Sequence, residues 1–222
     1  MGKERVNIFT GHFGSGKTEL SINYALTLKE THEKVAIVDL DIVNPFFRTS
    51  EQRDMLVGNG IRVIMPNFAN STVDVPSLPP DILSVLENKC WQVVLDVGGD
   101  DLGARVLGRY YHHLTRSGYR MFYVINTKRP LSDTAETIVD MLRQIEDSSR
   151  LKVTDLVNNT NLSYQTRACD IIDGQNIVNE VSKITGLPVT MVTGTENILR
   201  QLPRGYRHLV FPMKLYMKPP WN

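Results

Sequence analysis

The stretch GHFGSGKT, residues 11–18, constrains the fold of this 222-residue chain more than any other part of it. Gly11, Gly16, Lys17 and Thr18 fulfil the pattern G-x-x-x-x-G-K-[ST], which is typical of a loop that wraps around a polyphosphate. A strand-like run, VNIFT, precedes the loop, and a helical pattern follows it. Glycines let the backbone approach the anion closely, and the helix N-terminus then faces it. The sequence therefore predicts a phosphate-binding loop between a strand and a helix.

The side chains of this loop have separate expected tasks. Lys17 is expected to reach the β- and γ-phosphates and to take part in catalysis, and the Thr18 hydroxyl is expected to bind Mg²⁺. The other expected nucleotide contacts at the loop are Gly11, Phe13, Gly14, Ser15, Gly16 and Glu19.

Short apolar runs rich in β-branched residues alternate with helical patterns along the chain. Their nearly continuous apolar character favours a parallel sheet covered on both faces. The clearest helix is expected over 132–149, with Ser132 or Asp133 as its cap. We expect a P-loop NTPase of the α/β class, with a mostly parallel twisted sheet, helices on both faces, and one domain over 1–222. The expected strands are 6–10, 34–41, 61–65, 92–97, 119–125, 152–157 and 188–192.

Two of these strands end in acidic residues. QVVLDVGGDD provides Asp96 and then Gly99, where a carboxylate can hold a metal-bound water and a glycine amide can donate to the γ-phosphate. Asp39 and Asp41 end the second strand, and the alternation of side chains places both on one face, beside the phosphates. We expect Asp39, Asp96 and Thr18 to form the metal site and Asp41 to orient the attacking water. The alternative is an ordinary turn and a solvated strand end.

Composition excludes several other classes of protein. The net charge of +1 gives no strong field toward nucleic acid or an anionic membrane, and no run approaches the length of a membrane-spanning helix. Cys90 and Cys169 lie far apart and are expected to be reduced thiols of a cytoplasmic protein. The proline-rich segment 66–81 is either an ordinary surface loop or a partner-binding or switch loop. The basic tail, 202–222, is expected to pack as a strand or an extended cover.

The phosphate loop, the D-x-D after the second strand and the DVGGD after the fourth together resemble the MinD/ParA/Mrp and nitrogenase-iron-protein class of P-loop ATPases. The resemblance covers about the first hundred residues by motif. It implies a parallel sheet with the two motif strands adjacent, and often an ATP-dependent dimer. It also places Asp96 and Gly99 in a switch segment and makes Asp100 a second candidate for positioning the attacking water.

Three departures from that class limit what is transferred. His12 stands where the class commonly has a lysine that reaches across the dimer, and an imidazole does not replace a fixed ammonium. The cysteines do not match the cluster ligands of the iron protein or the paired C-x-x-C of iron–sulfur scaffold relatives. The tail is broken by prolines, unlike the amphipathic membrane helix that ends MinD.

Two short stretches of sequence bear on whether the protein binds adenine or guanine nucleotides. In NTKRP, residues 126–130, Pro130 occupies the place where a guanine-binding [NT]-K-x-D element has its aspartate. Asn158 and Asn159 match the place where the iron-protein-like ATPases put an adenine-contacting asparagine, and an amide can both donate to and accept from adenine. The alternative is that they are turn asparagines.

These features predict an ATP-binding protein with slow, Mg²⁺-dependent ATPase activity that changes its affinity for a protein partner or for a second copy of itself. Two other functions stay open. One is a small-molecule kinase or ATP-dependent ligase on the same fold, and the other is a nucleotide-gated binding module whose hydrolysis is incidental.

Overall fold

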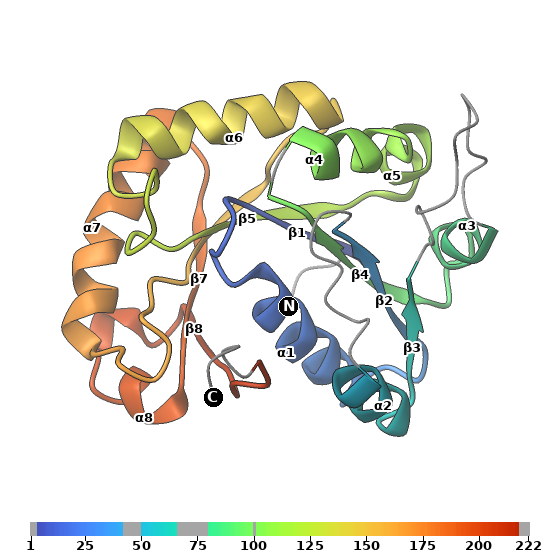
Figure 1. The fold of residues 1–222 in the computed structure, drawn as a ribbon, viewed down its shortest axis with the longest axis horizontal. Coiled ribbons are helices and arrows are strands. Elements are labelled where there is room, and N and C mark those ends of the chain that lie inside the picture. Colours follow the sequence, from blue (N-terminus) through green and yellow to red (C-terminus); the bar gives the residue numbers. More distant parts are fainter. Residues whose placement is uncertain (1–3, 42–49, 66–79, 100, 218–222) are drawn as a thin grey trace.

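The computed structural model describes residues 4–41, 50–65, 80–99 and 101–217. Most of the proline-rich segment, 66–79, lies outside the described residues. The strands form one sheet in the order β3-β2-β4-β1-β5-β6-β7-β8 (Figure 1). They are β1 (Val6–Thr10), β2 (Val35–Leu40), β3 (Ile61–Ile64), β4 (Gln92–Val97), β5 (Arg120–Ile125), β6 (Asp155–Asn158), β7 (Val189–Gly194) and β8 (Val210–Pro212).

At least one helix lies between each pair of consecutive strands. The helices are α1 (Lys17–Lys29), α2 (Ser50–Gly58), α3 (Pro80–Glu87), α4 (Asp101–Gly108), α5 (Tyr111–Ser117), α6 (Ala135–Ser149), α7 (Ala168–Thr185) and α8 (Glu196–Leu199), with a 3₁₀ turn, η2 (Arg204–Tyr206), before β8. Among the described residues no helix combines the length and apolar character needed to cross a membrane.

All neighbouring strands pair in parallel. This confirms the predicted α/β class and the P-loop NTPase architecture. Strand β1 lies between β4 and β5, so the strand before the phosphate loop and the strand that carries Asp96 are adjacent, as the resemblance implied. Because parallel strands end at the same edge, the loops after β1, β2, β4, β5 and β6 meet there.

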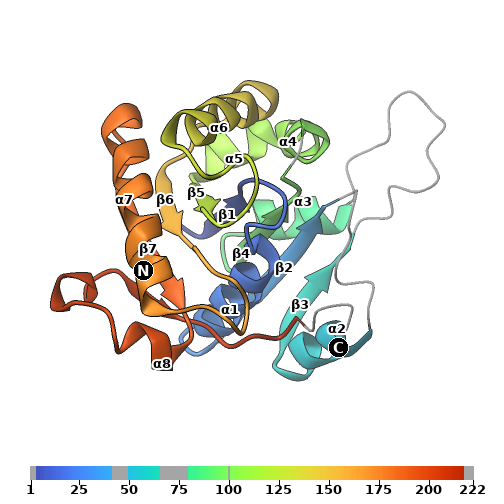
Figure 2. The ribbon, with the colours of Figure 1, turned by 60° about the vertical axis from the view of Figure 1, so that its left-hand side comes forward.

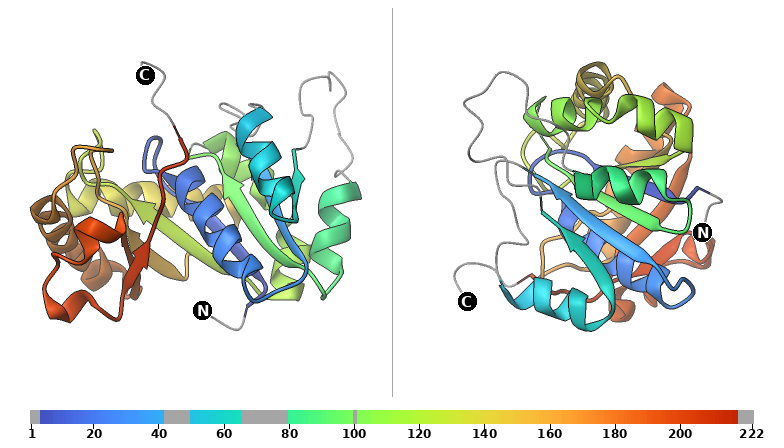
Figure 3. Two further views of the ribbon diagram at one scale, coloured as in Figure 1. Left: turned by 90° about the horizontal axis from the view of Figure 1, so that it is seen from below. Right: turned by 90° about the vertical axis from the view of Figure 1, so that its right-hand side faces the viewer.

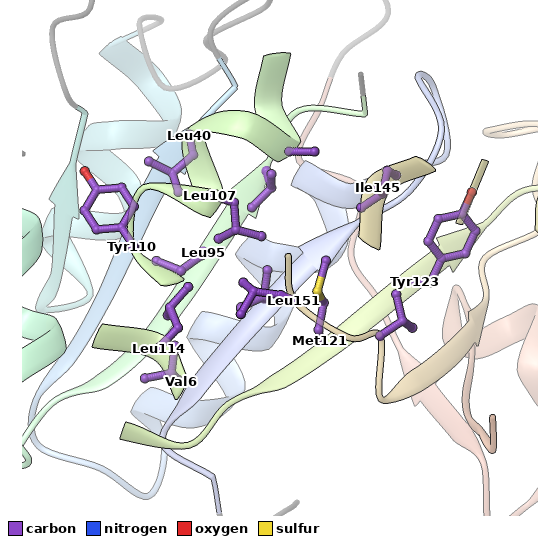
Figure 4. Packing of buried hydrophobic residues seen from close by; sticks show 14 of the residues in the cluster. Val6, Leu40, Leu95, Leu107, Tyr110, Leu114, Met121, Tyr123, Ile145 and Leu151 are labelled. Atoms are coloured by element: carbon purple, nitrogen blue, oxygen red, sulfur yellow. The ribbon is translucent and has the colours of Figure 1, made fainter. Parts of the chain in front are cut away.

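Helices cover both faces of the sheet (Figures 1 and 3). Apolar side chains of the strands alternate between the two faces and belong to two separate buried clusters. In β1, Val6 and Ile8 belong to one cluster and Phe9 to the other. The larger cluster packs α3, α4, α5 and α6 against the sheet, and Figure 4 shows part of it around Leu107 and Tyr110. Helices α1 and α2 cover the opposite face. The site edge is therefore held between two packed layers.

Helix α6 begins later than predicted. Its N-cap is Thr134, whose hydroxyl accepts a hydrogen bond from the Thr137 amide at 3.3 Å, so neither Ser132 nor Asp133 is the cap. Ser132 is used differently, because its amide donates to the Arg129 carbonyl at 3.1 Å and closes a turn. The helix therefore begins at Ala135, three residues after the start of the predicted range.

The segment 213–217, which we call the C-terminal strap, lies across α1 (Figures 2 and 3). The Asn23 amide group bonds both backbone groups of Lys214, donating to its carbonyl at 2.9 Å and accepting from its amide at 2.8 Å. Met213 is buried in the same core as α1. The described part of the tail, as far as Met217, therefore packs as a strand, β8, followed by an extended cover, as predicted.

Candidate functional site

Loop 11–16 has the backbone geometry that its glycines predict. Gly11, Gly14 and Gly16 have φ values of 141°, 74° and 86°, a region that other residues rarely adopt. A Cβ at position 11 would lie 2.3 Å from the Val124 carbonyl oxygen, and one at position 16 would lie 2.4 Å from Asn159 Nδ2. Neither backbone nor a buried amide has room to move, so both positions require glycine.

Lys17 folds back over this loop. Its side chain is buried, and its Nζ donates to the His12 carbonyl at 3.1 Å. Burial, and then the Lys17 ammonium, lower the pKa of His12, which favours the neutral form of this loop imidazole. The Phe13 side chain, by contrast, is 67% exposed to solvent. Because the Lys17 Nζ bonds the His12 carbonyl, its ammonium is held at the loop itself.

Buried polar atoms without a hydrogen-bond partner gather around the loop. Of six such side-chain atoms found among the described residues, four lie in or next to it: Thr10 Oγ1, His12 Nδ1, Ser15 Oγ and Asp96 Oδ2. Buried polar atoms are almost always paired in native proteins. This concentration is what a polar ligand at the loop would satisfy.

Asp39 and Asp96 lie opposite each other on β2 and β4. Both are buried, and Asp96 Oδ1 accepts a hydrogen bond from the Ser21 hydroxyl at 3.3 Å. Burial, and then the Asp39 carboxylate, raise the pKa of Asp96 to about 7, while Thr18 and Lys17 act in the opposite direction. The structure thus brings the three predicted metal-site residues, Thr18, Asp39 and Asp96, to one place.

This donor set fits Mg²⁺ that arrives with a nucleotide. The described residues contain no group of three or more His, Cys, Asp or Glu side chains able to hold a metal by themselves. Mg²⁺ usually binds one or two carboxylates and completes its shell with phosphates and waters. Asp96 Oδ2, buried and without a donor, is a suitable acceptor for a metal-bound water.

The segment after β4 contacts the loop directly. A Cβ at Gly99 would lie 2.4 Å from the Gly11 carbonyl oxygen and 2.8 Å from the Phe13 amide nitrogen. Only glycine allows this approach, and it places the Gly99 backbone where a switch glycine is expected. Asp100 lies outside the described residues. The Asp41 amide donates to Asp39 Oδ1 at 3.0 Å, and the Asp41 charge contributes to the raised pKa of Asp96.

Glu19 contacts the strap. Its carboxylate accepts from the amides of Tyr216 and Met217 at 2.6 and 3.2 Å, and burial raises its pKa. The side chain is thus bound to the chain's own backbone. A nucleotide contact by Glu19 stays a prediction.

Asn158 and Asn159 are both buried and both use their amide groups inside the protein. Asn158 Nδ2 donates to the Ile171 carbonyl and to Gln175 Oε1, at 3.1 and 3.0 Å. Asn159 Nδ2 donates to the Ser15 carbonyl at 2.6 Å, which ties the end of β6 to the phosphate loop. Their contact with adenine stays a prediction, and it would require these bonds to be exchanged.

The structure shows two contacts of the loop after β5 that were not predicted from the sequence. Arg129 Nε donates to the Gly14 carbonyl at 3.1 Å, so this arginine reaches the phosphate loop. Lys128 Nζ lies 3.3 Å from Oδ1 of the buried Asp170 on α7, so the lysine of NTKRP is paired with an acid from a distant helix. The Arg167 amide, which donates to Asp170, is the main cause of the lowered pKa of that carboxyl. No local signal could have revealed either contact, because both join distant segments.

No protein-family model and no curated protein sequence matches the chain. Solved structures match it in fold. FtsY from Thermotoga maritima is 17% identical, with a TM-score of 0.53 over 86% of this chain and 62% of the other. FlhF complexed with GTP and Mg²⁺ is 14% identical, with a TM-score of 0.54 over 88% of this chain and 67% of the other. The signal recognition particle 54 kDa protein from Aeropyrum pernix, in complex with GDP, is 14% identical, with a TM-score of 0.50 over 86% of this chain and 41% of the other.

At these identities the likeness establishes the fold, that of the P-loop NTPases. The chain spans about three fifths of the length of FtsY from Mycoplasma mycoides and from Thermotoga maritima, 61% and 62%. The matches described here, FtsY, FlhF and the 54 kDa protein, do not confirm the finer prediction of a MinD/ParA-like class.

Because the pKa of Asp96 is raised in the folded state, we expect Asp96→Asn to stabilise the protein in the absence of nucleotide and metal. Between about pH 4, the ordinary value for an aspartate, and about pH 7, the folded state holds a proton that the unfolded state has lost, so the wild type loses stability as pH rises. The free energy of unfolding of the variant, relative to that of the wild type, should therefore increase across this pH window. The difference should reach the order of a few kcal/mol and stay constant at higher pH.

Urea unfolding at several pH values, in the presence of a chelator, measures this gain. Asp173→Asn, on the exposed side of α7, is the matched control and should change little. A gain that does not vary with pH would show that the buried charge is not its cause.

Proposed function

We propose that the chain binds Mg²⁺-ATP at loop 11–18 and hydrolyses it slowly, changing its affinity for a protein partner in the process. One observation supports this above all others: the strained glycine loop, the buried Lys17 and the pair Asp39–Asp96 meet at a single edge of a P-loop NTPase fold. The partner is either another protein or a second copy of this chain, and the chain acts as one domain in the cytoplasm.

The residues of the proposed site have separate tasks on the phosphates, the metal ion and the attacking water. The loop amides and the Lys17 ammonium bind the phosphates, and Gly99 adds an amide for the γ-phosphate. Thr18, Asp39 and Asp96 would hold Mg²⁺, which neutralises the charge of the phosphate oxygens when it is bound. Asp41 orients the attacking water, with Asp100 as the rival for that task. Protein groups in phosphoryl transfer mainly position the reactants and stabilise charge, and this set is sufficient for both.

Lys17→Ala tests the proposed site. Removing the ammonium should weaken Mg²⁺-ATP binding at least tenfold, about 1.4 kcal/mol, while the domain stays folded. Calorimetric titration measures the affinity, and circular dichroism checks the fold. Lys183→Ala, on the exposed surface of α7, is the control. A folded Lys17→Ala protein with wild-type affinity for ATP would refute the phosphate contact.

For the base, two observations point in different directions. NTKRP lacks the aspartate of a guanine-binding element, while a structurally similar protein, FlhF, is described in complex with GTP and Mg²⁺. Asp170 does not replace that aspartate in the described structure, because it is buried and bound to Lys128 and Arg167. We therefore propose ATP as the preferred nucleotide. Competition between ATP and GTP for the wild-type site measures the preference, and equal or tighter binding of GTP would reverse the assignment.

Asp41→Asn separates binding from turnover. The substitution keeps the size of the side chain and removes its charge, so Mg²⁺-ATP should bind nearly as well while hydrolysis falls by roughly 10²-fold or more. Phosphate release under single-turnover conditions measures the step, with Asp147→Asn on the exposed side of α6 as the control. Wild-type hydrolysis in Asp41→Asn together with slow hydrolysis in Asp100→Asn would assign the water to Asp100 instead.

A further inference from the structure

The direction in which a bound nucleotide extends follows from the sheet order. The two acids that would hold Mg²⁺, Asp39 and Asp96, lie on β2 and β4, on one side of β1, while β5 and β6 lie on the other side. Metal ions in such sites bridge the terminal phosphates, and the base is at the opposite end of the nucleotide. The base therefore lies toward the ends of β5 and β6.

The amide side chains at that end of the sheet are largely committed to the protein. Asn126 is buried, and its side-chain Oδ1 accepts from the backbone amides of Lys128 and Asn161, each at 3.1 Å. Asn158 and Asn159 are bonded as described above. The Lys128 ammonium is paired with Asp170. A base bound at this end would therefore contact a protein group other than these amides and the Lys128 ammonium.

Arg129 offers such a surface. It is exposed, and it donates only its Nε to the Gly14 carbonyl among the described residues. Amides of a phosphate loop face the anion, so its carbonyls face away, and a guanidinium bonded to one stands on the outer rim of the loop. Gly14 makes the approach possible, because even a Cβ at this position would lie 3.3 Å from Arg129 Nε.

The backbone that carries Arg129 is fixed on both sides. The Arg129 amide donates to the Asn126 carbonyl, and its carbonyl accepts from Ser132, both at 3.1 Å. Between them Pro130 and Leu131 form a tight turn, with Leu131 at a φ of 62° that is unfavourable for a branched side chain. Unfavourable backbone geometry persists where the surrounding structure determines it, and it concentrates at ligand sites. Arg129 is thus held in place before any ligand arrives.

We propose that the Arg129 guanidinium is the platform on which the base of the bound nucleotide stacks. This rests on the proposed function and names a further contact of the same site. A planar guanidinium packs favourably on an aromatic face, and every base has such a face, so the contact adds affinity without distinguishing adenine from guanine. Selectivity between the two comes from other groups.

Three ligands and three variants test the proposal: Mg²⁺ complexes of ATP, GTP and base-free ribose 5-triphosphate, bound to Arg129→Ala, Arg129→Lys and the control Arg143→Ala. Arg143 is exposed on α6. Arg129→Ala should bind ATP and GTP about fivefold more weakly and ribose 5-triphosphate as well as the wild type does. Arg129→Lys keeps the charge but not the flat face, so it should resemble Arg129→Ala. Arg143→Ala should match the wild type with all three ligands.

Other outcomes overturn the proposal. An equal loss for ribose 5-triphosphate would mean that Arg129 serves the phosphates or the shape of the loop. Recovery of ATP affinity in Arg129→Lys would mean that charge rather than stacking matters, and a loss confined to one base would refute a non-selective contact. A wild-type chain that binds none of the three ligands would instead refute the proposed function, and this inference with it.

Discussion

Asp39 and Asp96 lie side by side on β2 and β4, and burying two acids together is unfavourable unless their charge is compensated. In the described structure the compensation comes from the Lys17 ammonium, hydroxyl donors on α1 and the raised pKa of Asp96. A divalent cation with a polyphosphate would replace the proton and satisfy both carboxylates. The folded protein is therefore least stable when both acids are ionised and no cation is bound. Groups that a binding site needs often lower the stability of the unliganded protein in this way.

The phosphate loop is held from the outside. Three of its carbonyls accept hydrogen bonds from side chains: that of His12 from Lys17, that of Gly14 from Arg129 and that of Ser15 from Asn159. Because the carbonyls are occupied in this way, the loop keeps its shape without a ligand. Preorganised donors cost no rearrangement when charge arrives, which is how such sites stabilise phosphoryl transfer.

Local patterns were sufficient to predict the fold and the centre of the site. Strand runs, the glycine spacing and the acids at strand ends are all set by neighbouring residues, so α/β class, loop geometry and the meeting of Thr18, Asp39 and Asp96 followed from them. Contacts between distant segments could not be predicted in the same way. Arg129 meets Gly14 across 115 residues, and Glu19 meets Tyr216 across 197. The delayed start of α6 likewise depended on a turn that Ser132 closes with Arg129.

The C-terminal strap has a consequence for the order of folding. Helix α1 follows directly after the glycine loop and carries Lys17 and Thr18, but residues made almost two hundred positions later cover part of its surface. Contacts of such high sequence separation form late and slow the folding of a domain. During synthesis the phosphate loop and its helix therefore emerge long before the segment that covers them. Until that segment arrives, apolar groups of α1 are open to chaperones and to aggregation.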